Sequence, residues 1–216
     1  MDYKSVLFVP GHEEKKIQKA YTLKSSLVVL DLESTVPDNK KNIAKEIIKK
    51  FSVDKTKTFI RINDESDLNF VAEEKFKGIF LPFTETRKQL ENISNRLSSI
   101  EKIKTEIIPI MESINGLANL KEICNYGERV KVVSFGSHDL AKSINLVISP
   151  DEKEILEFRK NIVNHSSNIE KPIDTSYLDF KNLKGFEKSC NLVKQLGFGG
   201  KACIHPDQIE ISNKIF

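Results

Sequence analysis

Eight short apolar segments recur along the chain, separated by longer polar stretches, and this alternation limits the possible folds more than any other feature. The apolar runs within them are continuous rather than alternating, which is typical of parallel strands covered by helices. The polar stretches at 39–51, 86–100 and 185–198 carry apolar residues at helical spacing. In the first stretch, Ile43, Ile47, Ile48 and Phe51 fit one face of a helix. The eight segments cover residues 5–10, 26–33, 56–63, 77–83, 105–112, 130–136, 171–178 and 200–206.

Eight strand–helix pairs predict a compact (β/α)8 TIM barrel. The chain has 216 residues, or 27 per pair, and no Pro/Gly/Ser-rich linker divides it, so we expect a single domain over residues 1–216. An open, doubly wound sheet is the alternative fold. Its dinucleotide-binding version has little support, because no G-x-G-x-x-G follows the first apolar segment.

Composition excludes several classes of protein. Lys and Arg number 34 against 31 Asp and Glu, and a net charge of +3 is too small a bias to indicate nucleic-acid or membrane binding. The N-terminus does not resemble a signal peptide, and no apolar run reaches the length of a membrane span. The three cysteines, Cys124, Cys190 and Cys203, have no metal-ligand spacing, which favours ordinary burial in a reduced compartment. We therefore expect a cytoplasmic protein.

Polar side chains stand where the apolar segments end. In a parallel barrel all strands end on one face, where active sites gather, so we expect these side chains to share one mouth. Each alone is explained as a solvated loop residue or a helix cap, but their recurrence favours a site. The candidates are Asp31, Glu33, Arg61, Glu112, His138, Asp139, Asp174 and His205.

The chemistry that fits such a cluster is the binding of a hard cation. Carboxylates without paired His or Cys favour Mg²⁺, with water and substrate completing the coordination. An arginine opposite them would bind an anionic substrate or stabilise a developing oxyanion. The residues alone thus predict a metal-dependent enzyme that acts on a small carboxylate.

Six motifs, in order over residues 5–216, resemble those of one family. They are SVLFVPGH, VVLDLES, FIRIN, PIMESINGLANL, VSFGSHDLAKSIN and GFGGKACIHPDQIEISNKIF. The ordered set resembles the HpcH/HpaI aldolase and citrate lyase beta-subunit family, within the phosphoenolpyruvate/pyruvate-barrel superfamily. Any one motif is weakly specific, whereas the set together indicates common ancestry.

The resemblance implies a site and a reaction. Glu112 and Asp139 would be the Mg²⁺ ligands, Glu112 would also contact substrate, and Arg61 would bind substrate and neutralise charge at the reacting oxygen. Glu33, or Asp31, would transfer a proton. The implied reaction cleaves a citryl thioester of coenzyme A or acyl carrier protein into oxaloacetate and an acetyl thioester, or cleaves a malyl or citramalyl relative. The implied assembly is a homo-oligomer, a trimer or hexamer, or a subunit of a lyase complex.

Structural explanations remain open for the same residues. Glu112 could cap or pair with a helix beginning near Asn115, and Asp139 could be an acid favoured at a helix N-terminus. Arg61 could form an ion pair with Asp31 or Glu33. We expect His205, at the end of the last strand, to have a hydrogen-bonded scaffold role. We expect His12 and His138 to lie in loops near the mouth. Residues 197–201, GFGGK, precede the last strand, so we expect a helix end there and no phosphate loop.

Departures from the family pattern leave the substrate open. Ser34 stands in place of the second acid of L-D-L-E-D, and Asn145 in place of a glycine. Thr175 and Ser176 follow Asp174 where D-G-V is usual. The chain also ends in the eighth helix, without the C-terminal segment that covers the site in part of the family. Two alternatives follow: a class II aldolase that releases pyruvate with a histidine base, tested by His12→Ala, and a degenerate barrel that only binds a ligand or partner.

Overall fold

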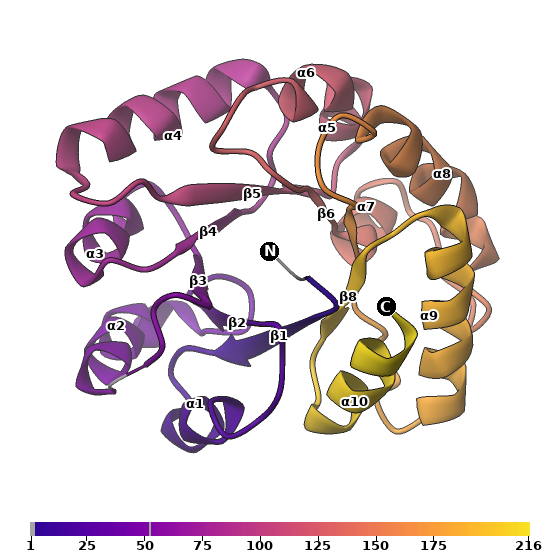
Figure 1. The fold of residues 1–216 in the computed structure, drawn as a ribbon, viewed down its shortest axis with the longest axis horizontal. Coiled ribbons are helices and arrows are strands. Elements are labelled where there is room, and N and C mark those ends of the chain that lie inside the picture. Colours follow the sequence, from indigo (N-terminus) through magenta and orange to yellow (C-terminus); the bar gives the residue numbers. More distant parts are fainter. Residues whose placement is uncertain (1–2, 52) are drawn as a thin grey trace.

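The computed structural model describes residues 3–51 and 53–216, and their strands close into a parallel barrel surrounded by helices (Figure 1). Each strand pairs in parallel with the next along the chain, and β8 pairs with β1, with Val6 opposite Ala202. This closure confirms the predicted (β/α)8 barrel and rules out the open sheet.

The strands of this described part are β1 (Ser5–Pro10), β2 (Leu27–Asp31), β3 (Thr58–Arg61), β4 (Gly78–Leu81), β5 (Glu106–Met111), β6 (Ser134–Phe135), β7 (Ile173–Asp174) and β8 (Gly200–Cys203). The α-helices are α1 (Glu14–Ala20), α2 (Lys41–Lys50), α3 (Asp67–Glu74), α4 (Arg87–Ile100), α5 (Ile114–Ala118), α6 (Leu120–Cys124), α7 (Ser137–Ser143), α8 (Leu156–His165), α9 (Leu183–Leu196) and α10 (Pro206–Ile215). Two short 3₁₀ helices, Asp38–Lys40 and Lys153–Ile155, precede α2 and α8.

Alternate strand residues fill the barrel interior, as the two-residue repeat of a strand requires. Val29, Phe59 and Ile108 belong to one buried cluster there. Phe80 also lies in that cluster and packs edge-on against Phe8 and Phe59, at ring distances of 5.3 and 5.7 Å. These aromatic rings make the barrel a packed core rather than a pore, so a ligand can enter only at its ends.

A second, larger core lies between the strands and the helices, and it shows which faces of the helices are buried. In α2 the buried residues are Ala44 and Ile48, whereas Ile43 is 55% exposed. The prediction that Ile43 shares the buried face was therefore wrong, because the i, i+4 pair Ala44 and Ile48 faces the barrel. The three cysteines lie in this outer core, free and buried, as predicted.

Helix ends follow local sequence signals. The side chain of Thr86 accepts a hydrogen bond from the backbone N–H of Gln89 and so caps α4. Gly197 ends α9 in the left-handed region, with φ of 114°, a conformation that glycine adopts at little cost. The helix end predicted for residues 197–201 is confirmed at Gly197, whereas Gly200 and Lys201 already belong to β8.

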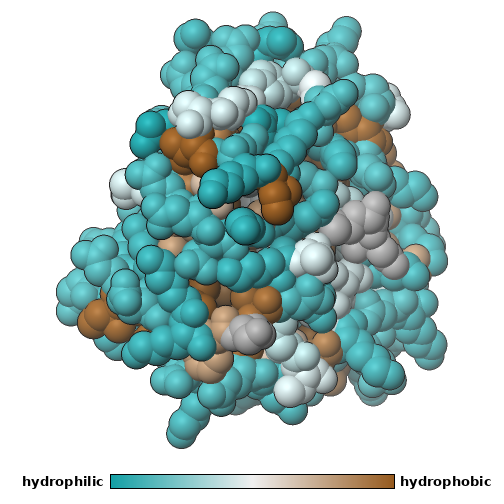
Figure 2. Space-filling view, turned by 60° about the vertical axis from the view of Figure 1, so that its left-hand side comes forward, coloured by the Kyte–Doolittle hydropathy of each residue, from teal (hydrophilic) through white to brown (hydrophobic). Residues whose placement is uncertain are grey.

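The surface shown in Figure 2 is mostly hydrophilic, with scattered hydrophobic patches. Among the described residues, none of the helices has both the length and the hydropathy needed to cross a bilayer.

Candidate active site

Asp31 and Arg61 form a buried ion pair at the carboxyl ends of adjacent strands. The register of β2 and β3 places the two residues opposite each other. Arg61 Nε donates to Asp31 Oδ1 at 2.6 Å, and a terminal guanidinium nitrogen donates to Oδ2 at 2.5 Å. Asp31 is fully buried and also accepts hydrogen bonds from the backbone N–H groups of Glu33 and Thr35, both at 3.0 Å. Its carboxylate is therefore fixed in place by several donors.

The remaining donors of Arg61 reach Glu33 and Ser34. The second terminal nitrogen lies 3.1 Å from Glu33 Oε2, and Ser34 Oγ accepts a hydrogen bond at 2.7 Å. The ion pair weighed as a structural explanation for Arg61 is thus present. It does not remove Arg61 from the site, because Arg61 also lines the cavity described below. Ser34, a departure from the family pattern, orients this arginine.

Glu112 follows β5 directly and is buried beside the other site residues. Its Oε1 accepts a hydrogen bond of 2.7 Å from the backbone N–H of Phe83. Burial and the nearby charges of Asp139 and Glu33 raise the pKa of Glu112 to about 8, against the opposing effects of the Phe83 bond and Arg61. The helix after it is capped by Ser113, so Glu112 is not that cap.

Asp139 is carried by the first turn of α7, directly after β6. Gly136 lies between this helix and Glu112, and a Cβ at position 136 would lie 2.6 Å from Glu112 Oε2 and 2.7 Å from its Cβ. Only glycine allows the backbone so close to the Glu112 side chain. Asp139 is an acid at a helix N-terminus and also lines the same cavity as Glu112.

Glu112 and Asp139 are suited to hold Mg²⁺. The electrostatic effect of Asp139 on Glu112, in a buried setting, is the mutual repulsion that a divalent cation relieves. The described residues contain no cluster of three or more Asp, Glu, His or Cys side chains placed around one metal position. Magnesium does not require one, since it is usually held by one or two carboxylates with waters and substrate oxygens.

A cavity of about 830 Å³ opens beside these residues, at the carboxyl ends of the strands. Arg61, Glu112, Asp139 and His138 supply charged and polar groups to its lining. Much of the rest is apolar, from Phe8, Ile110, Phe135, Leu178, Phe180 and Ile204, and Lys15, Lys16 and Lys19 of α1 border one side. A concave, mostly apolar pocket with a few convergent charged groups is the usual form of a small-molecule site.

Asp174 does not face this cavity, which corrects the expectation for strand seven. Ile173 points into the barrel, so Asp174 points outward to the helices. Its buried carboxylate binds Arg159 through two hydrogen bonds of 2.9 Å and pairs with Lys201. Arg159 also lies 3.0 Å from Glu152. These four residues form a structural network between β7, β8 and the helices.

The histidines have the following positions. His205 is the N-cap of α10, in a capping box with Gln208, which confirms its predicted scaffold role. His138 lies in the first turn of α7, rather than in a loop, and its Nε2 lies 3.0 Å from the backbone oxygen of Ser176. His12 lies in the turn between β1 and α1, as expected.

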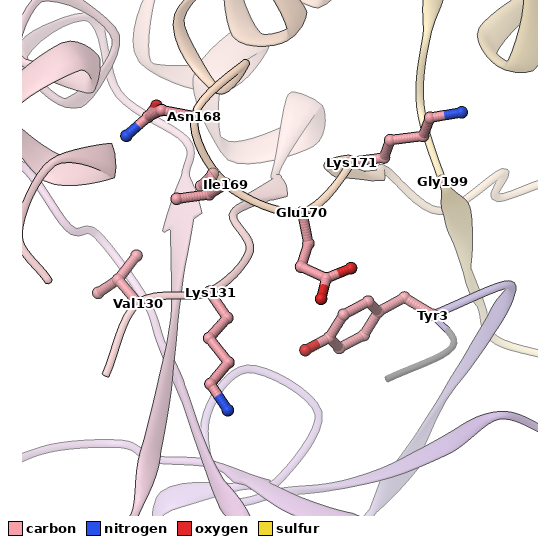
Figure 3. Close-up of a pocket in the computed structure, with 8 residues that line it drawn as sticks. All are labelled: Tyr3, Val130, Lys131, Asn168, Ile169, Glu170, Lys171 and Gly199. Atoms are coloured by element: carbon pink, nitrogen blue, oxygen red, sulfur yellow. The ribbon is translucent and has the colours of Figure 1, made fainter. Parts of the chain in front are cut away.

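A second cavity, of about 730 Å³, lies at the opposite end of the barrel (Figure 3). Its lining comes from segments that precede strands, including Tyr3, Lys131 and Lys171. Figure 3 shows the Glu170 carboxylate directed toward the ring of Tyr3, and burial together with Glu106 and Glu170 raises the pKa of that phenol. Among the described residues, those that line this cavity include one acid, Glu170, and no arginine, and parallel barrels act at the other end.

Sequence reasoning missed three contributors to the site. The Phe83 donor is a backbone group and leaves no side-chain signal. Its φ of 45° is unusual for an aromatic residue and indicates a turn held in a strained conformation. Gly136 was visible in the sequence, but its role depends on a contact that only the structure shows. The α1 lysines were also missed, because one face of a short basic helix resembles an ordinary solvated surface.

Comparisons with known proteins place the chain among lyases. The family model for HpcH/HpaI aldolase/citrate lyase matches residues 4–206. The mitochondrial citramalyl-CoA lyase of Rattus norvegicus is 32% identical over an alignment 239 residues long, which covers 99% of this chain and 71% of that protein. The citrate lyase subunit beta of Haemophilus influenzae is 27% identical over 231 residues, spanning 99% of this chain and 79% of that protein.

A solved structure has the same fold. The citrate lyase beta subunit from M. tuberculosis, complexed with oxaloacetate and magnesium, superposes with a TM-score of 0.87. The match covers 99% of this chain and 96% of that chain, at 22% sequence identity. At this identity the likeness establishes the architecture.

Proposed function

The chain belongs to the HpcH/HpaI aldolase/citrate lyase family, and from that premise we propose that it is a Mg²⁺-dependent carbon–carbon lyase acting on an acyl thioester. The products would be a 2-keto acid and a shorter acyl thioester. The substrate would be a citryl thioester, giving oxaloacetate and an acetyl thioester, or a citramalyl or malyl relative.

One observation carries the proposal: an arginine fixed by an ion pair and two carboxylates line one cavity. Arg61 lies at the end of β3, Glu112 after β5 and Asp139 after β6, and all three line the cavity at the carboxyl ends of the strands. The joint presence of Arg61, Glu112 and Asp139 around one cavity argues against a degenerate barrel, since drift should have removed at least one of them.

The proposed reaction needs a cation, an anion-binding group and a proton acceptor. Glu112 and Asp139 would hold Mg²⁺, which when bound would polarise the oxygens of the keto-acid part. Arg61 would stabilise negative charge on the reacting oxygen. The substrate hydroxyl gives up its proton, the carbon–carbon bond breaks to leave a keto group and a thioester enolate, and a proton converts the enolate to the acyl thioester.

Glu33 is the more accessible of the two candidates for proton transfer, although neither Glu33 nor Asp31 is among the described residues that line the cavity. The side chain of Glu33 is 22% exposed and forms an ion pair with Arg61. Asp31 is fully buried, and both of its oxygens are held by donors. We therefore assign Asp31 the role of orienting Arg61 and Glu33 that of the proton acceptor.

The basic side of the cavity suits the carrier end of a thioester. Lys15, Lys16 and Lys19 of α1 are part of the lining of this cavity. Coenzyme A and acyl carrier protein both attach the acyl group through a phosphate-bearing arm, which a lysine-lined groove attracts. The apolar lining would cover the uncharged part of that arm and exclude water from the enolate.

Turnover assays test the proposal. Citryl-, citramalyl- and malyl-CoA are supplied with Mg²⁺ or with EDTA, and keto-acid release is followed. Arg61→Ala and Glu112→Gln should each lower turnover by roughly 10²–10³, the loss expected for one stabiliser of a developing oxyanion. Matched changes on the exposed face of α4, Arg87→Ala and Glu91→Gln, should leave it unchanged. Near-normal turnover in both site variants would refute the assignment.

The assembly is a separate proposal. We expect a homo-oligomer, a trimer or hexamer, or a subunit of a lyase complex, and sedimentation analysis of the purified chain measures its mass. A sedimenting monomer would contradict the homo-oligomer.

A further inference from the structure

The segment after β7 contacts the start of α7. Thr175 is buried, and its Oγ1 accepts two hydrogen bonds from Ser137, one from the backbone N–H at 3.2 Å and one from the hydroxyl at 3.0 Å. Ser137 is the first residue of α7 and lies 38 positions earlier in the chain. A strand end thus supplies a hydrogen-bond acceptor to the first turn of a neighbouring helix.

This contact replaces a cap that α7 cannot supply itself. The first N–H groups of a helix need acceptors, which a side chain at the N-cap usually provides. The N-cap of α7 is Gly136, which has no side chain and makes no cap hydrogen bond. A larger residue is excluded there, because its Cβ would lie 2.6 Å from Glu112 Oε2. The close approach to Glu112 therefore leaves α7 without its own cap.

The neighbouring residues strengthen the connection. His138, which follows Ser137, lies with its Nε2 3.0 Å from the backbone oxygen of Ser176. Asp174, which precedes Thr175, is fixed by Arg159 and Lys201. The end of β7 is consequently anchored on one side and holds two successive residues of α7 on the other.

We propose that Thr175 is a positioning residue: it caps α7 from the adjacent strand and so fixes Asp139 relative to Glu112. The proposal rests on the proposed function, since it assigns Asp139 to the metal. Thr175 departs from the D-G-V pattern usual in the family, in which a glycine without a hydroxyl follows the aspartate. Groups that orient a metal ligand typically change metal affinity by about 10- to 100-fold when removed.

Three variants separate positioning from general stability. Thr175→Val keeps the shape of the side chain and removes the acceptor, whereas Thr175→Ser keeps the hydroxyl. Thr58→Val is the matched control, because Thr58 is also buried and hydrogen-bonded, to Tyr21 and the backbone oxygen of Asp54, but lies at the start of β3, at the opposite end of the barrel.

The readouts are the Mg²⁺ dissociation constant by calorimetry, in the presence of oxaloacetate, and amide hydrogen exchange at residues 137–140 in metal-free protein. Thr175→Val should weaken Mg²⁺ binding about tenfold and speed the amide exchange. Thr175→Ser should keep both the affinity and the exchange rate at their wild-type values. Thr58→Val should lower the melting temperature and leave both readouts unchanged.

Each outcome decides between the proposals. Wild-type affinity and exchange in Thr175→Val would overturn the positioning role. Faster exchange with unchanged affinity would also overturn it, since capping would then not reach Asp139. If the wild type binds no Mg²⁺, the proposed function and the role of Thr175 toward the metal are both refuted. Faster exchange in Thr175→Val would then show only that Thr175 caps α7.

Discussion

Replacing Asp31 by Asn should destabilise the barrel more than its small change in shape suggests. Five donors point at the two carboxylate oxygens: two from Arg61, two from Thr35 and the backbone N–H of Glu33. An amide nitrogen in place of either oxygen would face at least two of these donors. Breaking a buried ion pair costs about 3–5 kcal/mol, and we expect the lower end, about 3 kcal/mol, because Glu33 still pairs with Arg61.

Thermal unfolding measures this loss. For a chain of this size, about 3 kcal/mol corresponds to a decrease of roughly 6–12 °C in melting temperature. Ser34→Ala is the control, because it removes one acceptor from the same guanidinium. It should cost only about 1 kcal/mol. A melting temperature of Asp31→Asn within 2 °C of wild type would refute the reasoning.

The difference in stability between wild type and Asp31→Asn should shrink as the pH falls. Burial alone would raise the pKa of Asp31, but the hydrogen bonds and charge of Arg61 outweigh it and hold the pKa below its ordinary 3.8. A carboxyl whose pKa is lowered by folding stabilises the fold above the unfolded pKa and loses that contribution as pH falls through the folded one. The advantage of wild type over Asp31→Asn should therefore be full above about pH 4 and shrink at lower pH.

Three further changes test other parts of the structure. Gly136→Ala should lower turnover about 10²-fold by displacing Glu112, and unchanged turnover would contradict the close approach. Asp174→Asn should cost about 3–5 kcal/mol in urea unfolding at pH 7, because it leaves Arg159 and Lys201 buried without their carboxylate; an unchanged midpoint would contradict this. His12→Ala should leave turnover within about threefold, as expected for a group outside the chemistry, and a large loss would favour the pyruvate-releasing aldolase.

The sequence predicted the barrel because eight continuous apolar runs require helices on their outer side. It also predicted that Asp31, Arg61 and Glu112 lie where strands end. In the structure these three lie two residues beyond Val29, Phe59 and Ile110, which point into the barrel. The same reasoning failed at Asp174. When both faces of a strand are buried, the apolar pattern does not show which alternate residues point inward.

The positioning of the side chains was not accessible from the sequence. The backbone N–H of Phe83 donates to Glu112, which lies 29 residues later in the chain. Ser137 donates to Thr175, which lies 38 residues later. No periodicity connects such positions, because they meet only once the barrel has closed. The departure from D-G-V at Thr175 was the one available signal, and its meaning depends on Gly136 being unable to cap α7.

The central claim is that Glu112 and Asp139 hold a magnesium ion to which a keto acid binds beside Arg61. The most direct test is a calorimetric titration of oxaloacetate, with Mg²⁺ and then with EDTA, into wild type and Glu112→Gln. We predict binding to wild type with Mg²⁺, and none with EDTA or in Glu112→Gln. Binding that persists in EDTA or in Glu112→Gln, or no binding to wild type under either condition, would contradict the account.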